Sequence, residues 1–183
     1  KDTILRKKYI FRGLLISSSY LLLSCFIKIY TLKQFEKALL KQGIEYSEII
    51  VKPTAFNLIL WNANVATQDN YLLGDYSLFD TQPISFTAYS KNKILESQLN
   101  GNSDFEKLQN ASEGWYIISR KNQSLYFNDL RFGLLNDDPK NPQFAFSYQF
   151  IRNNDELKAV EVPKNKREGK RLLQKIVIRV KGN

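Results

Sequence analysis

The order of hydrophobic and polar residues separates one long apolar run near the start of the chain from shorter runs after it. From Gly13 to Tyr30 the sequence carries no charge before Lys28. A helix of this length is close to what is needed to cross a bilayer about 30 Å thick, so we predict a transmembrane helix. The alternative is a long amphipathic core helix of a soluble protein, because four serines can form a polar stripe, Ser17, Ser18, Ser19 and Ser24.

The flanks of the apolar run indicate an anchor that is not cleaved. The helical pattern continues through Phe35, Leu39 and Leu40 to an expected stop at Gly43, and no small-residue cleavage site follows the run as in a signal peptide. Basic residues before the run favour an extracytoplasmic position for the domain after it. The lysines on the far side weaken that contrast, Lys28, Lys33, Lys37 and Lys41.

Residues 44–162 have a different texture, with short runs typical of strands. The expected strands cover residues 48–51, 56–66, 71–78, 84–89, 115–119, 124–128 and 144–151. Between the two sets lies a short helical stretch, in which we expect Ser103 to cap a helix that carries Phe105. Residues 121–123 are typical of a hairpin connection. The pattern predicts an α+β domain with a mainly antiparallel β-sheet and one or two short helices, preceded by the anchor helix over residues 1–43.

The last part, residues 163–183, is a basic tail whose periodicity fits two structures. Residues 175–181 alternate between apolar and basic side chains, as a strand does, but Leu172, Leu173, Ile176, Val177 and Val180 also share one helical face. A helix and a strand therefore both remain open for residues 172–181. As a helix, the segment resembles one that binds an anionic membrane surface.

Charge and length narrow the function classes. The chain has 183 residues, enough for one domain, and a formal net charge of +9 that is concentrated at its two ends. Nucleic-acid binding is not expected, because the aromatic residues lie in the apolar runs rather than among the basic residues. Membrane lipid is the partner that the anchor and the basic ends predict.

The residue types from which hydrolytic sites are usually built are scarce. The chain has no histidine, the commonest general base near neutral pH and the commonest ligand of catalytic zinc. Its one cysteine, Cys25, is expected to be buried, and no glycine-rich phosphate loop or serine elbow is present. We therefore expect no complete active site and no cofactor in this chain.

Two short motifs supply the candidate functional residues. In the first, Asn57 follows Pro53-Thr54 and precedes the apolar run that ends in Trp61; a structural turn competes with a functional role. In the second, Asn128, Asp129 and Arg131 lie among aromatic residues, where the carboxylate and the guanidinium either clamp a ligand or pair with each other. Asp137 and Asp138 fit a solvated loop better than a metal site.

Several segments together resemble one bacterial family. The chain looks like the C-terminal part of the LexA-regulated, membrane-bound metal-dependent hydrolases over residues 14–150. The segments that carry the resemblance are the apolar span, 53–61, Gly74-Asp75-Tyr76-Ser77-Leu78, Tyr126-Phe127-Asn128-Asp129-Leu130-Arg131-Phe132-Gly133, and Phe144-Ala145-Phe146-Ser147. The resemblance implies an inner-membrane protein whose histidine motifs, and any divalent metal, lie in transmembrane helices upstream of this chain.

The chain begins without Met, and we expect it to be a fragment of a longer polypeptide. The favoured function is a C-terminal accessory or substrate-facing domain of a membrane-bound metal-dependent hydrolase, in contact with the upstream transmembrane region. No histidine motif is matched here, so no metal ligand is carried over from the family. The alternative is a non-enzymatic envelope module that binds a protein, glycan or lipid headgroup through exposed Tyr, Trp and Arg.

Overall fold

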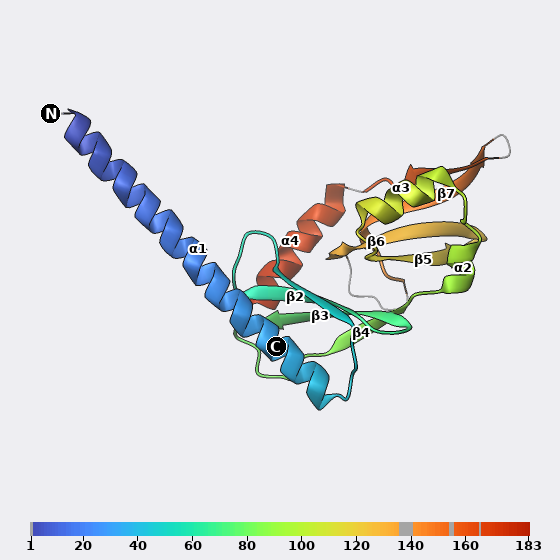
Figure 1. Cartoon of the computed structure of the whole chain (residues 1–183), viewed down its shortest axis with the longest axis horizontal. Coiled ribbons are helices and arrows are strands. Elements are labelled where there is room, and N and C mark those ends of the chain that lie inside the picture. The colour runs from blue at the N-terminus through green and yellow to red at the C-terminus, as the bar shows by residue number, and fades with distance from the viewer. Residues whose placement is uncertain (1, 136–140, 154–155, 165) are drawn as a thin grey trace.

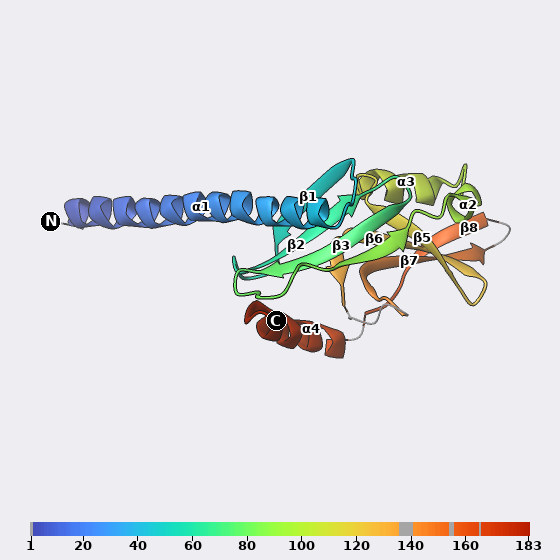
Figure 2. The same ribbon diagram turned by 90° about the horizontal axis from the view of Figure 1, so that it is seen from below.

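A computed structural model describes residues 2–135, 141–153, 156–164 and 166–183. A long N-terminal helix leads into two antiparallel sheets of four strands each, accompanied by shorter helices (Figure 1). The predicted α+β class, with a long apolar helix before a mainly antiparallel β domain, is confirmed. The two sheets lie side by side along the molecule (Figure 2).

The first helix, α1 (Asp2–Lys41), ends at the predicted stop. Gly43 has a φ of +66°, a conformation that glycine adopts without the strain of a Cβ. The Ile44 N–H donates to the Leu39 carbonyl at 3.0 Å and the Gly43 N–H to the Leu40 carbonyl at 3.1 Å. These two bonds form a Schellman motif, and Ile44 packs on the same core as Leu39.

The two halves of α1 have opposite environments. Large apolar side chains from Leu5 to Phe26 are exposed, whereas Phe35 and Leu39 are 0% exposed. Ile27 is half-buried against the domain core. We call residues 5–26 the free part of α1. The helix is long and apolar enough to cross a membrane, and its last turns belong to the folded domain.

The first sheet, sheet A, is a meander of β1 (Glu48–Pro53), β2 (Leu60–Ala66), β3 (Asn70–Ser77) and β4 (Phe86–Ser90). The C-terminal half of α1 packs on one of its faces. Alternate strand residues point to that face, where they form a core with the helix: Phe35, Leu39, Val51, Trp61, Ala63, Val65, Leu72 and Ile84.

The second sheet, sheet B, repeats the order with β5 (Tyr116–Lys121), β6 (Ser124–Leu134), β7 (Phe144–Asn153) and β8 (Glu156–Glu161). The short helices α2 (Lys93–Ser97) and α3 (Ser103–Ala111) contribute to its core. That core contains Leu99, Phe105, Tyr116, Ile118, Leu125, Phe127 and Phe150. The predicted hairpin at 121–123 is confirmed: Asn122 and Gln123 both have positive φ, as a type I′ turn requires.

A third cluster joins the sheets. Tyr89 of β4 packs against Phe144 of β7 with ring centroids 5.4 Å apart. Asn64 of β2 is buried, and its Nδ2 donates to the Leu130 carbonyl of β6 at 2.9 Å. The register of β6 against β7 shifts between Asp129 and Leu134. Leu130, which accepts the bond from Asn64, lies in this irregular part of β6.

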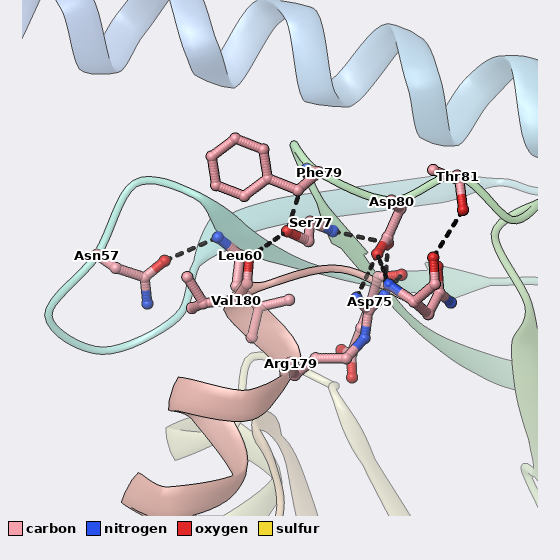
Figure 3. Close-up of polar contacts among 10 residues, drawn as sticks. Asn57, Leu60, Asp75, Ser77, Phe79, Asp80, Thr81, Arg179 and Val180 are labelled. Atoms are coloured by element: carbon pink, nitrogen blue, oxygen red, sulfur yellow. Dashed lines mark hydrogen bonds and ion pairs between the residues drawn. The ribbon is translucent and has the colours of Figure 1, made fainter.

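The C-terminal segment forms a helix, α4 (Lys166–Val180), which settles the open choice between helix and strand. The chain end after α4 is bound to the loop that follows β3 (Figure 3). Ser77 Oγ donates to the Val180 carbonyl at 2.7 Å, and Thr81 Oγ1 donates to the Asn183 carbonyl at 2.8 Å. Arg179 forms an ion pair of 2.5 Å with Asp80. We call these contacts the C-terminal latch.

Several boundaries differ from the prediction. The strand expected from Phe56 begins at Leu60, because the Asn57 side chain folds the preceding residues into a turn. Asn102, not Ser103, caps α3, since its Oδ1 accepts the Phe105 N–H at 2.9 Å. Strand β8 was not predicted. Cys25 is exposed on the free part of α1 rather than buried, since that part has no protein neighbour to cover it.

Candidate functional site

The Asp129 and Arg131 side chains pair with each other on β6. Arg131 Nη2 lies 2.8 Å from Asp129 Oδ2, and its Nε lies 3.2 Å from Oδ1. The Arg131 backbone N–H also donates to Asp129 Oδ1 at 2.9 Å. The carboxylate is buried, and its lone pairs are largely used by one residue. Of the two roles that the sequence left open, the structure has the internal pair.

Cations and aromatic rings gather beside this pair. Lys52 of β1 lies 6.0 Å from the centre of the Phe132 ring, and Lys164 lies 3.5 Å from that of Phe146. The two rings are 4.7 Å apart, and the Arg131 guanidinium lies 5.3 Å from the Phe132 ring. Burial lowers the pKa of Lys52 below its ordinary value; Asp129 opposes that shift and Arg131 adds to it.

Asn128 has a structural position on the same strand. It is buried, with Nδ2 donating to Ser119 Oγ at 2.9 Å and Oδ1 accepting from Ser147 Oγ at 2.8 Å. These contacts tie β6 to both of its neighbours, β5 and β7. A buried amide that is bonded on both sides holds strands together and has no atom left to face a ligand.

Asn57 and Trp61 lie in sheet A, apart from the β6 residues along the fold. Asn57 Oδ1 accepts the Ile59 and Leu60 N–H groups at 3.0 and 2.7 Å, and its Nδ2 donates to Thr54 Oγ1 at 2.6 Å. Trp61 is buried in the core, and its Nε1 donates to the Leu58 carbonyl at 2.8 Å. Both residues therefore shape the loop between β1 and β2.

A small, half-open pocket lies at the junction of the two sheets. Its volume is about 220 Å³, and it is lined by Tyr71, Lys91, Lys93, Glu96, Gln109, Gly114, Tyr116, Ile117 and Ile118. We call it the junction pocket. Its residues come from β3, the segment after β4, α2, α3 and β5. No run in the sequence unites them, which is why sequence analysis missed the site.

Hydrogen bonds already fix the polar groups of the junction pocket. Tyr116 donates to Glu96 Oε1 at 2.6 Å and accepts from Gln109 Nε2 at 2.8 Å. Tyr71 donates to the Gly114 carbonyl at 2.7 Å. Lys91 Nζ lies 4.7 Å from the Tyr71 ring centre and donates to the Thr67 carbonyl at 2.5 Å. These bonds hold the side chains in place, and the hydroxyl protons of Tyr116 and Tyr71 are donated to protein acceptors.

The electrostatics of the pocket favour binding over proton transfer. Burial raises the pKa of Tyr116 above its ordinary value, and the hydrogen bond to Glu96 and its charge raise it further. Burial also raises the pKa of Tyr71, with smaller contributions from Glu96 and Glu48. Both hydroxyls stay protonated near neutral pH and act as hydrogen-bond donors. A general base needs a pKa closer to the working pH.

The acidic side chains that the structure describes do not form a metal site. Within the described ranges no group of three or more His, Cys, Asp or Glu side chains comes together, and the Asp129 carboxylate is taken up by Arg131. Asp137 and Asp138, weighed above as a metal site, lie outside the described residues.

Comparison with known proteins gives no match at any level: no family model, no curated protein and no solved structure resembles the chain significantly.

Proposed function

We propose that this chain is a membrane-anchored, substrate-facing accessory domain of a membrane-bound hydrolase, on the extracytoplasmic side of a bacterial inner membrane. The observation that carries the proposal is the continuity of α1. The same helix has a free part with exposed apolar side chains and a second part that is buried in sheet A. A soluble domain does not leave so large an apolar surface uncovered without a partner, and a bilayer is the partner that its length fits.

The polar groups support an accessory role rather than a catalytic one. The candidates Asp129 and Arg131 pair with each other, and the junction pocket is lined by tyrosine, lysine and glutamate side chains. Such a pocket binds and orients a ligand through hydrogen bonds and positive charge. If the chain belongs to the hydrolase family suggested by its sequence motifs, the chemistry would lie in upstream transmembrane helices, and a pocket of this kind would hold part of the substrate.

The test compares the longer membrane protein with this chain alone, both purified in detergent. The readouts are hydrolysis of chromogenic phosphate mono- and diesters with Mn²⁺ or Zn²⁺. Turnover confined to the longer protein supports the proposal. Turnover and stoichiometric metal in this chain alone, lost on Asp129→Ala, would overturn it.

A pair of variants tests the role of the junction pocket in the same assay. Lys91→Gln removes a charge at the pocket and is expected to raise KM by about tenfold or more, the loss of one charge-assisted contact, with little change in kcat. The matched control is Lys121→Gln, on the exposed β5–β6 hairpin. Equal behaviour of the two variants would remove the pocket from the proposal.

The second candidate is an envelope module that binds its ligand without any enzyme. The junction pocket supports it, because lysine, glutamate and tyrosine side chains from several elements converge there. Under this reading the isolated chain binds a glycan or lipid headgroup in the absence of metal, and Lys91→Gln weakens that binding. The two candidates differ in whether an attached upstream region changes the affinity.

A further inference from the structure

One end of sheet A lies at the level where α1 leaves the domain. Leu60 pairs with Ser77 at this end. The neighbouring Tyr76 packs on Phe35 with ring centroids 6.1 Å apart, and it also forms a side-chain hydrogen bond with Tyr30 of α1. Both views show the β1–β2 loop and the C-terminus at the edge of the domain nearest the free part of α1 (Figures 1 and 2). We call this edge the proximal end.

The β1–β2 loop presents a phenylalanine that folding does not explain. Phe56 is 97% exposed and has a φ of +63°. Exposure forgoes the free energy of burying the ring, and a positive φ strains a residue with a bulky side chain. The next residue, Asn57, fixes the loop by hydrogen bonds to Thr54, Ile59 and Leu60. The ring is therefore held outward on an ordered loop.

Other exposed apolar side chains lie at or near the same end. Phe79, in the loop after β3, is 60% exposed and lies toward α1 (Figure 3). The latch holds the end of α4 against this loop, and a Cβ at Gly182 would clash with the Phe79 backbone, so the fit is close. On α4, Leu173, Val177 and Ile178 are at least half exposed.

The chemistry of this surface fits lipid. Helix α4 runs across the direction of α1 rather than along it (Figure 1), which is the direction of the membrane plane if α1 spans the bilayer. Its sequence is rich in cations: besides Arg179 of the latch it contains Lys166, Arg167, Lys170, Arg171 and Lys175. Apolar side chains flanked by lysine and arginine are typical of segments that lie between headgroups and acyl chains of anionic membranes.

We propose that the proximal end sits in the surface of the membrane that α1 crosses, with Phe56, Phe79 and the exposed flank of α4 in contact with anionic lipid. The domain is then held by two attachments: the span, and a peripheral contact some distance from it. This inference rests on the membrane anchoring proposed above. Contact with lipid explains why Phe56 is exposed and has a positive φ, which the packing of the fold does not explain.

The test places single spin labels in the full chain, in nanodiscs of phosphatidylcholine and phosphatidylglycerol. Cysteines replace Phe56, Phe79 and Val177 one at a time in a Cys25→Ser background. Two collision rates are measured for each label: one with oxygen, which concentrates in lipid, and one with a water-soluble nickel complex. Their ratio shows whether the label lies in lipid or in water. The control is Gln68→Cys, an exposed residue in the turn at the opposite end of sheet A.

The expected result is a reversal of that ratio: oxygen dominates at 56, 79 and 177, and the nickel complex dominates at 68. A label at Ser18→Cys separates the two proposals, because it tests the span alone. Oxygen dominance at 18 with a water-like ratio at 56, 79 and 177 would overturn the lipid contact and leave the anchor intact. A water-like ratio at 18 would overturn the anchor itself.

A second variant separates membrane contact from folding. Phe56→Asn replaces the ring by a residue that adopts positive φ more readily, so the melting temperature in detergent is expected to stay level or rise. In nanodiscs the label at 177 is expected to become more accessible to the nickel complex. If the accessibility of the label at position 177 does not change, Phe56 and α4 do not contact the membrane together.

Discussion

Sheet A and sheet B have the same strand order but different covers. Each is a meander of four antiparallel strands. Sheet A is covered on one face by α1, and α4 is latched to its proximal end. Sheet B has its own short helices, α2 and α3, and its own aromatic core. Among the described residues, sheet A shares its core with α1, whereas sheet B packs against sheet A.

The two sheets are expected to serve different functions, membrane anchoring for sheet A and ligand binding at its junction with sheet B. The residues with the most unusual exposure, Phe56 and the free part of α1, belong to the half that contains sheet A. The junction pocket lies where sheet B and its helices meet the edge of sheet A. Substitutions in one sheet are thus expected to separate anchoring from binding. Trp61 lies in the core of sheet A, whereas Trp115 lies at the junction, directly before β5, with its ring centroid 5.4 Å from that of Tyr71 of β3.

The largest effect is expected from Phe35→Ala, which removes a buried ring from the interface between α1 and sheet A and leaves a cavity there. Phe35 is fully buried and packs against Tyr76 and Phe86, so the loss is about 3–5 kcal/mol of unfolding free energy. Urea unfolding in detergent, followed by Trp61 in a Trp115→Phe background, measures it. Phe105→Ala on α3, in the core of sheet B, is the matched control; its ring packs on Tyr116, next to Trp115, so it should act first on Trp115. Equal responses of both tryptophans to both variants would show one cooperative unit.

A smaller loss is expected from breaking the latch with Asp80→Asn. Asp80 is buried, and although burial raises its pKa, hydrogen bonds from Arg179 and the Ser77 and Asn183 N–H groups lower it below the ordinary value. A lowered pKa stabilises the fold above the unfolded pKa of about 3.9, and the contribution disappears as pH falls through the folded value. We expect a loss of about 1.5–3 kcal/mol near neutral pH.

The pH dependence of the latch is the internal check. The wild type is expected to lose α4 contacts only below about pH 4, whereas Asp80→Asn should have no such transition. A label at Val177 detects release of the helix. A transition of equal size in the variant would mean that another carboxylate controls the latch.

The contact between the sheets is tested by Asn64→Ala. The change removes the buried bond to the Leu130 carbonyl and leaves that acceptor without its partner, at a cost of about 1–2 kcal/mol. Hydrogen exchange should show faster opening of β6 near Leu130 than of β2. Asn100→Ala, at an exposed position, is the control and should stay within about 0.5 kcal/mol of wild type.

The smallest effect is expected from Glu113→Gln at the edge of sheet B. Glu113 is 76% exposed and lies 3.5 Å from Arg131, so solvent screens the pair and the change should be within about 0.5 kcal/mol. Asp129→Asn, which alters the buried partner of the same guanidinium, should cost more. A larger loss for Glu113→Gln, measured by thermal unfolding, would mean that Arg131 depends on the outer partner.

Local signals in the sequence predicted the local structure. Gly43 marked the end of α1 because only a positive φ closes that helix end, and residues 121–123 marked a hairpin. The predicted start of β2 at Phe56 was wrong, because the Asn57 side chain accepts the Ile59 and Leu60 N–H groups and folds these residues into a turn instead of a strand. The periodicity of residues 172–181 fitted both a helix and a strand, and the contacts of Arg179 and Val180 with Asp80 and Ser77 are distant in the sequence.

The candidate site was predicted only in part, for the same reason. Asp129 and Arg131 are two residues apart, so their pairing was among the expected outcomes. The junction pocket draws on Tyr71, Glu96 and Tyr116, whose proximity depends on how the sheets pack. The division into two sheets was not predicted either, since strand patterns show which residues face a core but not which strands pair.

The unbroken course of α1 has a mechanical consequence. No proline interrupts residues 2–41, and the helix passes without a hinge from its free part into the core of sheet A. If α1 spans a bilayer and tilts to match a thinner one, the domain is therefore expected to tilt with it as one rigid body. The thickness of the lipid layer would then set how far the junction pocket stands above it.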